Sequence, residues 1–184
     1  FLDFIIKFNC RSLIDIGANI GEVPLSIIKN LNGIKYIGIE PSPDEFKCLS
    51  KNLSINMDEY KVLNNVCGEI NNVNLEFYLS SEQADSSVIK PDHNSKKIIL
   101  KQTTIDTLIE KYDLTNVFIK IDTEGYEPET IKGMKRQINK VNFISVDCGF
   151  ERGLEKLSTL PLVTSILYEK GFEMIKNNKK RMTF

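Results

Sequence analysis

The sequence of 184 residues has little that would direct it to a membrane or to nucleic acid. Its 24 lysine and arginine residues nearly balance 25 aspartate and glutamate residues, so the net charge of -1 provides no general attraction for nucleic acid or an anionic membrane. No apolar run reaches the roughly 20 residues of a membrane span, and no segment resembles a signal peptide. We therefore expect a cytoplasmic protein that binds no nucleic acid and inserts into no membrane.

Cysteine and histidine are both scarce. The four cysteines lie far apart and form no CxxC pair, so we expect small buried side chains in a reducing compartment rather than a disulfide framework or a zinc site. Because the chain has no cluster of histidine and cysteine ligands, we expect no essential metal ion. The single histidine, His93, has the chemistry of a general base, but a lone loop histidine is more often solvated. We assign it no catalytic role.

Short apolar runs rich in β-branched residues alternate with amphipathic stretches along the whole chain. This alternation is typical of βαβ units and predicts an α/β fold with a mostly parallel sheet. Since 41% of the residues are hydrophobic and no segment resembles a linker, we expect residues 1–184 to form one domain, with residues 1–11 as a lead-in helix. The expected strands are residues 12–16, 35–40, 61–66, 74–79, 117–122 and 143–147, with one or two closing strands within 172–184.

A glycine-bearing turn directly follows the first expected strand. Gly17 and Gly21 lie between that strand and the next helix, where glycine lets the backbone turn sharply and lets a ligand approach the main chain. A dinucleotide fingerprint would require glycines at positions 17, 19 and 22, but the chain has Asn19 and Glu22. The turn therefore favours a nucleoside ligand without a pyrophosphate, whose amino-acid part lies against the loop.

Carboxylates end several of the expected strands. These are the side chains of Asp15, Glu40, Asp122 and Asp147. In open α/β sheets the carboxyl ends of the strands form the ligand crevice, and four negative charges there suit a cationic ligand such as a sulfonium. Glu40 is also placed to accept both ribose hydroxyls of a nucleoside. The alternative is that such carboxylates only cap the following helices, which we favour for Asp147.

Three motifs in the sequence resemble the FkbM family of methyltransferases. They are Asp15–Glu22 (DIGANIGE), Ile39–Pro43 (IEPSP) and Ile119–Glu127 (IKIDTEGYE), in the order and spacing of that family. The first motif is shared by many methyltransferases, whereas the third is much more specific to this family. The resemblance implies a Rossmann-like class I methyltransferase, with a mostly parallel seven-stranded sheet, helices on both faces, and S-adenosylmethionine as the cofactor.

The resemblance also implies which residues form the site. Those assigned to the cofactor are Asp15, Gly17, Asn19, Gly21, Glu40, Asn65 and Asp122. Asp122 is expected to orient the cofactor or the acceptor, and Asp122 or Glu124 is expected to take the proton of the acceptor hydroxyl. The alternative is that both carboxylates only brace the turn at Gly125.

The expected reaction is O-methylation of a hydroxyl on a sugar, a glycan or a small metabolite, because members of the family modify such compounds. Residues 80–97 are polar, and residues 80–100 are expected to form a loop on the substrate side. Two alternatives stay open, namely an RNA or protein methyltransferase on the same fold and a non-catalytic module that binds S-adenosylmethionine. The sequence names neither the acceptor nor the oligomeric state.

Overall fold

Side chains of strand β1 (Ser12–Ile16) alternate between two hydrophobic clusters, one on each face of a central sheet. Leu13 packs into one cluster, and Ile14 and Ile16 pack into the other. A strand that is buried on both faces is typical of a parallel sheet with helices on either side. The computed structural model that shows this arrangement describes residues 2–27, 33–80, 86–89, 95–153, 155–178 and 181–184.

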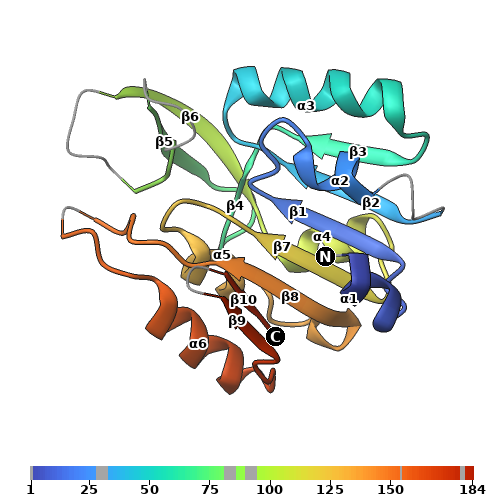
Figure 1. Ribbon diagram of the computed structural model, residues 1–184. Helices are drawn as coiled ribbons and strands as arrows, with labels where there is room; N and C mark the ends of the chain where they lie inside the picture. The colour runs from blue at the N-terminus through green and yellow to red at the C-terminus, as the bar shows by residue number, and fades with distance from the viewer. Residues whose placement is uncertain (1, 28–32, 81–85, 90–94, 154, 179–180) are drawn as a thin grey trace.

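The central sheet has seven strands in the order β3-β2-β1-β7-β8-β10-β9 (Figure 1). The strands other than β1 are β2 (Lys35–Ile39), β3 (Tyr60–Leu63), β7 (Val117–Ile121), β8 (Val141–Asp147), β9 (Lys176–Asn178) and β10 (Arg181–Thr183). The pairs from β3 to β8 are parallel, and β10 is antiparallel to both β8 and β9. The predicted class, a mostly parallel seven-stranded sheet of Rossmann-like type, is confirmed.

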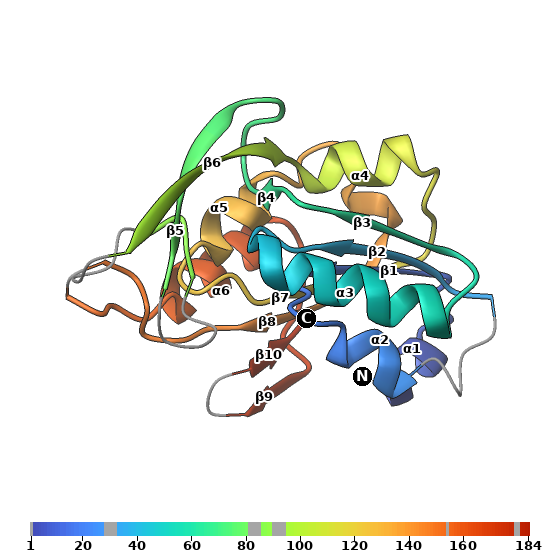
Figure 2. The same ribbon diagram turned by 90° about the horizontal axis from the view of Figure 1, so that it is seen from above.

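Helices cover both faces of this sheet, as Figure 2 shows from above. The helices on one face are α1 (Leu2–Lys7), α2 (Glu22–Ile27) and α3 (Pro43–Asn56), and those on the other are α4 (Ile105–Lys111), α5 (Glu127–Lys132) and α6 (Leu160–Glu169). A short 3-10 helix, η2 (Ile138–Lys140), precedes β8. Leu49 and Leu53 of α3 pack into the cluster that contains Leu13, whereas Leu108 of α4 packs into the opposite cluster. The fold is therefore built of three layers.

A second, smaller sheet lies beside the central one, and of its strands only residues 74–79 were expected with the bounds that the structure gives. Its strands are β4 (Val66–Cys67), β5 (Asn74–Leu79) and β6 (Lys96–Thr103), in the order β4-β6-β5. The first five residues of β6 lie in the segment 80–100 that was expected to be a loop. They form a strand because they pair antiparallel with β5, a partner that local sequence does not reveal.

Two further expectations can be placed against the described residues. His93, to which no catalytic role was assigned, lies outside them. Within the described part of the chain, none of the helices combines the length and the apolar character that crossing a membrane would need.

Candidate functional site

A pocket opens at the carboxyl ends of β1, β2 and β7. The residues of the predicted site that line it are Gly17, Asn19, Glu40, Asp122 and Glu124. The small sheet contributes Val66, Cys67 and Phe77 to the wall, next to Tyr126 from the turn after β7. The pocket thus combines carboxylates at the strand ends with an apolar and aromatic wall, a composition common in small-molecule and cofactor sites.

Gly17 lies where the loop after β1 closely approaches the loop after β7. Its backbone is in the left-handed region (φ +73°), and a Cβ placed on it would overlap the main-chain carbonyl oxygen of Asp122. The N–H groups of Gly17 and Ala18 both donate to the carbonyl oxygen of Ile39, each at 3.0 Å. Because the loops after β1 and β7 touch at this position and the β1 loop is also bonded to β2, no larger residue fits there.

Glu40 joins the loops that follow β1 and β2. One carboxylate oxygen accepts the N–H of Asn19 at 2.7 Å, and the other accepts the N–H of Ser42 at 2.8 Å. Burial raises the pKa of Glu40 to about 7, although these two hydrogen bonds act in the opposite direction. Asn64, which sequence reasoning missed, donates its amide to the carbonyl oxygens of Glu40 and Pro41, both at 2.8 Å.

Asp15 lies beneath the pocket and does not line it. Its side chain is fully buried, accepts the hydroxyl of Tyr36 at 3.0 Å and lies 3.3 Å from the ammonium of Lys120. Burial raises the pKa of Asp15, whereas Lys120 and Tyr36 act to lower it. The expected contact between Asp15 and the cofactor stays a prediction, and in this structure the carboxylate supports the loop above it.

Lys120 is the second residue that sequence reasoning missed. Its side chain is 7% exposed although it carries a charge, and its ammonium donates to the carbonyl oxygen of Gly17 at 2.5 Å. The same ammonium lies 3.6 Å from the carboxylate of Asp122. Lys120 therefore connects Asp15, the glycine turn and Asp122. The signal in the sequence was a single lysine inside a strand whose other residues are all apolar.

Gly21 and Asn65 lie outside the lining of the pocket. Gly21 has φ +92°, its N–H donates to the carbonyl oxygen of Ala18 at 2.9 Å, and it directly precedes α2. The side-chain amide of Asn65 donates to the carbonyl oxygen of Lys101 in β6 at 2.9 Å. Their proposed cofactor contacts stay predictions.

The turn between β7 and α5 is connected to two neighbouring segments. The hydroxyl of Ser87 donates to the carbonyl oxygen of Glu124 at 2.7 Å, which joins the turn to the segment after β5. The guanidinium of Arg152 donates to the carbonyl oxygen of Gly125 at 2.9 Å and pairs with the carboxylate of Glu129 at 2.6 Å. The strand ends and both of these neighbours thus meet around Glu124.

Metal-binding side chains do not gather at this site. Among the residues that the structure describes, no group of three or more histidine, cysteine, aspartate or glutamate side chains is placed to hold a metal ion. The expectation that no metal is essential stays a prediction.

The strand order, the helices on both faces and a pocket at the carboxyl ends of β1, β2 and β7 together define a Rossmann-like class I methyltransferase fold. The family model described as the methyltransferase FkbM domain matches residues 15–174. The chain belongs to the FkbM methyltransferase family. No curated protein matches the sequence significantly.

Solved structures agree with this fold at low sequence identity. An S-adenosylmethionine-dependent methyltransferase from Aquifex aeolicus is 12% identical with a TM-score of 0.53, over 98% of this chain and 85% of that one. Residues 961–1257 of StiE O-MT are 6% identical with a TM-score of 0.55, over 95% of this chain and 50% of that one. TrmK of M. capricolum, solved with S-adenosylhomocysteine, is 10% identical with a TM-score of 0.51, over 99% of this chain and 64% of that one. The chain therefore spans between half and 85% of these structures.

Proposed function

We propose that this protein binds S-adenosylmethionine in the pocket and transfers its methyl group to a hydroxyl oxygen of a sugar, a glycan or a small metabolite. The observation that supports this most is the position of Glu40, a buried carboxylate at the junction of the β1 and β2 loops inside the pocket. Membership of the FkbM family supports the same cofactor, and a protein of similar fold was solved with S-adenosylhomocysteine.

Each part of the cofactor has a matching part of the pocket. In the proposal the ribose hydroxyls donate to Glu40, and the amino-acid part lies against Gly17 and Asn19. The adenine lies against Val66 and Cys67, which line the pocket directly after Asn65. Asp15 and Gly21 act from behind the loop by fixing its shape, because neither reaches the lining.

The carboxylates of Asp122 and Glu124 are assigned to the reacting end. The acceptor oxygen attacks the methyl carbon as the bond from that carbon to sulfur breaks, and S-adenosylhomocysteine leaves as a neutral thioether. The hydroxyl proton passes to Asp122 or Glu124, both of which line the pocket. Because the sulfonium is already an activated leaving group, the main task of the protein is to align the two partners.

Replacing Glu40 with alanine tests the binding part of the proposal. We expect Glu40→Ala to weaken S-adenosylhomocysteine binding by about 1.5–3 kcal/mol for each charge-assisted hydrogen bond lost, measured by calorimetry. Asp44→Ala is the control, because Asp44 is an exposed carboxylate in the first turn of α3 that does not line the pocket. Equal affinities of the wild type and Glu40→Ala would remove Glu40 from the site, and a wild type that binds neither form of the cofactor would overturn the proposed function.

The raised pKa of Glu40 predicts a pH dependence of binding. With a pKa of about 7 in the free pocket, the carboxyl is mostly protonated at pH 6 and mostly ionised at pH 8. Ribose hydroxyls bind the ionised form better, so we expect S-adenosylhomocysteine to bind about tenfold more weakly at pH 6 than at pH 8. The variant Glu40→Gln removes the titrating group and should make the affinity nearly independent of pH over this range. A wild-type profile as flat as that of Glu40→Gln would contradict the assignment.

The same shift affects the stability of the free protein in the opposite direction. A carboxyl whose pKa is higher in the folded than in the unfolded protein binds more protons when folded. Its contribution to stability is therefore complete below the ordinary value of 4.5 and is lost as the pH rises through about 7. Occupation of the pocket should offset this loss at pH 8, which thermal unfolding with and without S-adenosylhomocysteine measures.

A further inference from the structure

Glu127 has not been assigned a role, although it lies at the end of the third motif. It is the first residue of α5, its side chain is 1% exposed, and it does not line the pocket. One of its carboxylate oxygens, Oε1, accepts three hydrogen bonds from the turn before the helix. The donors are the N–H of Thr123 at 3.1 Å, the hydroxyl of Thr123 at 3.0 Å and the N–H of Gly125 at 3.0 Å.

The turn between Thr123 and Glu127, which these hydrogen bonds hold, has an unfavourable backbone conformation. Glu124 has φ +50° and Gly125 has φ +98°, so two successive residues are in the left-handed region. For a residue with a side chain, such as Glu124, this conformation persists only where its surroundings impose it. The backbone N–H groups of the residues on either side of Glu124 both donate to a single oxygen of Glu127, so that oxygen bridges the left-handed turn.

The same turn carries the residues assigned to the reaction. These are Asp122 and Glu124, which line the pocket together with Thr123 and Tyr126 of the same turn, whereas Glu127 does not line it. An effect of Glu127 on the reaction must therefore pass through the turn. All three hydrogen bonds are accepted by Oε1 of Glu127. In a glutamine at this position the amide oxygen can accept the same hydrogen bonds, but it carries no charge.

We propose that Glu127 is a positioning residue, whose Oε1 sets the left-handed turn at Glu124 and thereby aims the carboxylates of Asp122 and Glu124 at the sulfonium. This inference rests on the proposed function, because it assumes that S-adenosylmethionine occupies the pocket. It assigns to Glu127 the role of an acceptor of hydrogen bonds and not that of a charge or a base.

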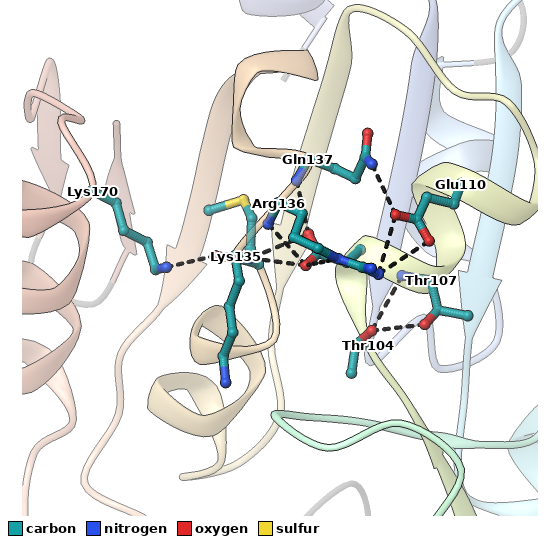
Figure 3. A network of polar contacts seen from close by, with 9 residues as sticks. Thr104, Thr107, Glu110, Lys135, Arg136, Gln137 and Lys170 are labelled. Carbon is teal, nitrogen blue, oxygen red and sulfur yellow. Dashed lines mark hydrogen bonds and ion pairs between the residues drawn. The ribbon is translucent and has the colours of Figure 1, made fainter.

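A second buried carboxylate offers a matched control. Asp106 of α4 is 4% exposed and accepts the N–H groups of Lys135, Arg136 and Gln137 at 2.9–3.1 Å. In Figure 3 the side chains of Arg136 and Gln137 reach toward Glu110, whereas the side chain of Lys135 points away from it. This carboxylate thus organises a turn in the same way as Glu127, but none of these residues lines the pocket.

The test compares the affinities of S-adenosylmethionine and S-adenosylhomocysteine, measured by calorimetry in each variant. The two ligands differ only by the methyl group and the positive charge on sulfur, so their affinity ratio reports how well the pocket carboxylates face the sulfonium. Glu127→Asp keeps the charge but withdraws the acceptor by one methylene, and Glu127→Gln keeps the acceptor but removes the charge. We expect the affinity ratio in favour of S-adenosylmethionine to fall about fivefold in Glu127→Asp, which is the effect of losing one partly exposed ion pair. In Glu127→Gln we expect the ratio to stay at the wild-type value.

The controls separate this role from a general effect on folding. Asp106→Ala should lower the melting temperature yet leave the affinity ratio unchanged, and a loss as large as that of Glu127→Asp would overturn the proposal. An unchanged ratio in Glu127→Asp would show that Glu127 only stabilises α5, and a lowered ratio in Glu127→Gln would show that its charge matters; either result overturns the proposal. A wild type that binds neither ligand overturns the proposed function and this inference with it, whereas failure of the variants alone overturns only the inference.

Discussion

Gly17→Ala is expected to weaken the binding of both S-adenosylmethionine and S-adenosylhomocysteine strongly. The added methyl group would overlap the main-chain carbonyl oxygen of Asp122, and backbone cannot move aside as a flexible side chain does. The loops after β1 and β7 must separate, which displaces Asn19 and Asp122 from the pocket together. We expect the affinity to fall by at least about 100-fold and the melting temperature to fall as well, because an overpacked site costs about 1–3 kcal/mol.

A second glycine separates the overlap from the effect of backbone conformation. Gly171 also has a positive φ, +85°, but a Cβ placed on it meets nothing within 4 Å. Gly171→Ala therefore carries only the strain of the left-handed backbone, roughly 1 kcal/mol, and should keep full affinity. Calorimetry and thermal unfolding of both variants provide the comparison. If Gly17→Ala binds S-adenosylhomocysteine as tightly as Gly171→Ala does, the contact between the two loops has no part in the site.

The central strands were predictable because their signals are local. The residues of β1 were expected with the same bounds as the structure gives, since a short apolar run ends there in a glycine turn. Strand β6 was missed for the opposite reason. It begins with two lysines, and its pairing partners lie 17 to 27 residues away along the chain, from the pair Leu79 and Lys96 at one end to Asn74 and Lys101 at the other. No local pattern distinguishes such a strand from a polar loop.

The candidate site also contains residues whose position could be predicted from the sequence and one whose surroundings could not. Gly17, Glu40 and Asp122 line the pocket because each directly follows a parallel strand, and the order of strands in the sheet brings those ends together. Asp15 lies two residues earlier, directly opposite Lys120 in the neighbouring strand, and this depth in the sheet buries it. Sequence spacing gives the face on which a side chain lies, but the register between strands decides what it meets.

Replacing Lys120 with methionine is expected to destabilise the protein by about 3–5 kcal/mol. Methionine has a similar length and leaves no large cavity, so the loss comes from the charge and its hydrogen bond. Without the ammonium, the fully buried carboxylate of Asp15 lacks the cation that lies 3.3 Å away in the wild type, and the carbonyl oxygen of Gly17 loses a donor. Thermal and denaturant unfolding at pH 7 measure the change, with Lys97→Met as the control. Lys97 forms an exposed ion pair with Glu76 and should contribute little because water screens it.

The pH dependence of that loss identifies its origin. Burial already raises the pKa of Asp15, and removal of Lys120 raises it further because the main opposing charge is gone. A raised pKa in the folded protein means that stability falls as the pH rises through it. The loss of stability in Lys120→Met, relative to the wild type, should therefore be smaller at pH 5 than at pH 8.

The double variant Asp15→Asn with Lys120→Met completes the test as a double-mutant cycle. An asparagine at position 15 can still accept the hydroxyl of Tyr36, which lies 3.0 Å from the native carboxylate, and it needs no cation. We therefore expect the double variant to be more stable than Lys120→Met alone, with a coupling of about 1–3 kcal/mol between the two positions. Its stability should also depend less on pH between 5 and 8, because the buried titrating group has been removed. If the two changes are simply additive and the pH dependence survives, Lys120 acts on the glycine turn alone and the ion pair with Asp15 contributes nothing to the fold.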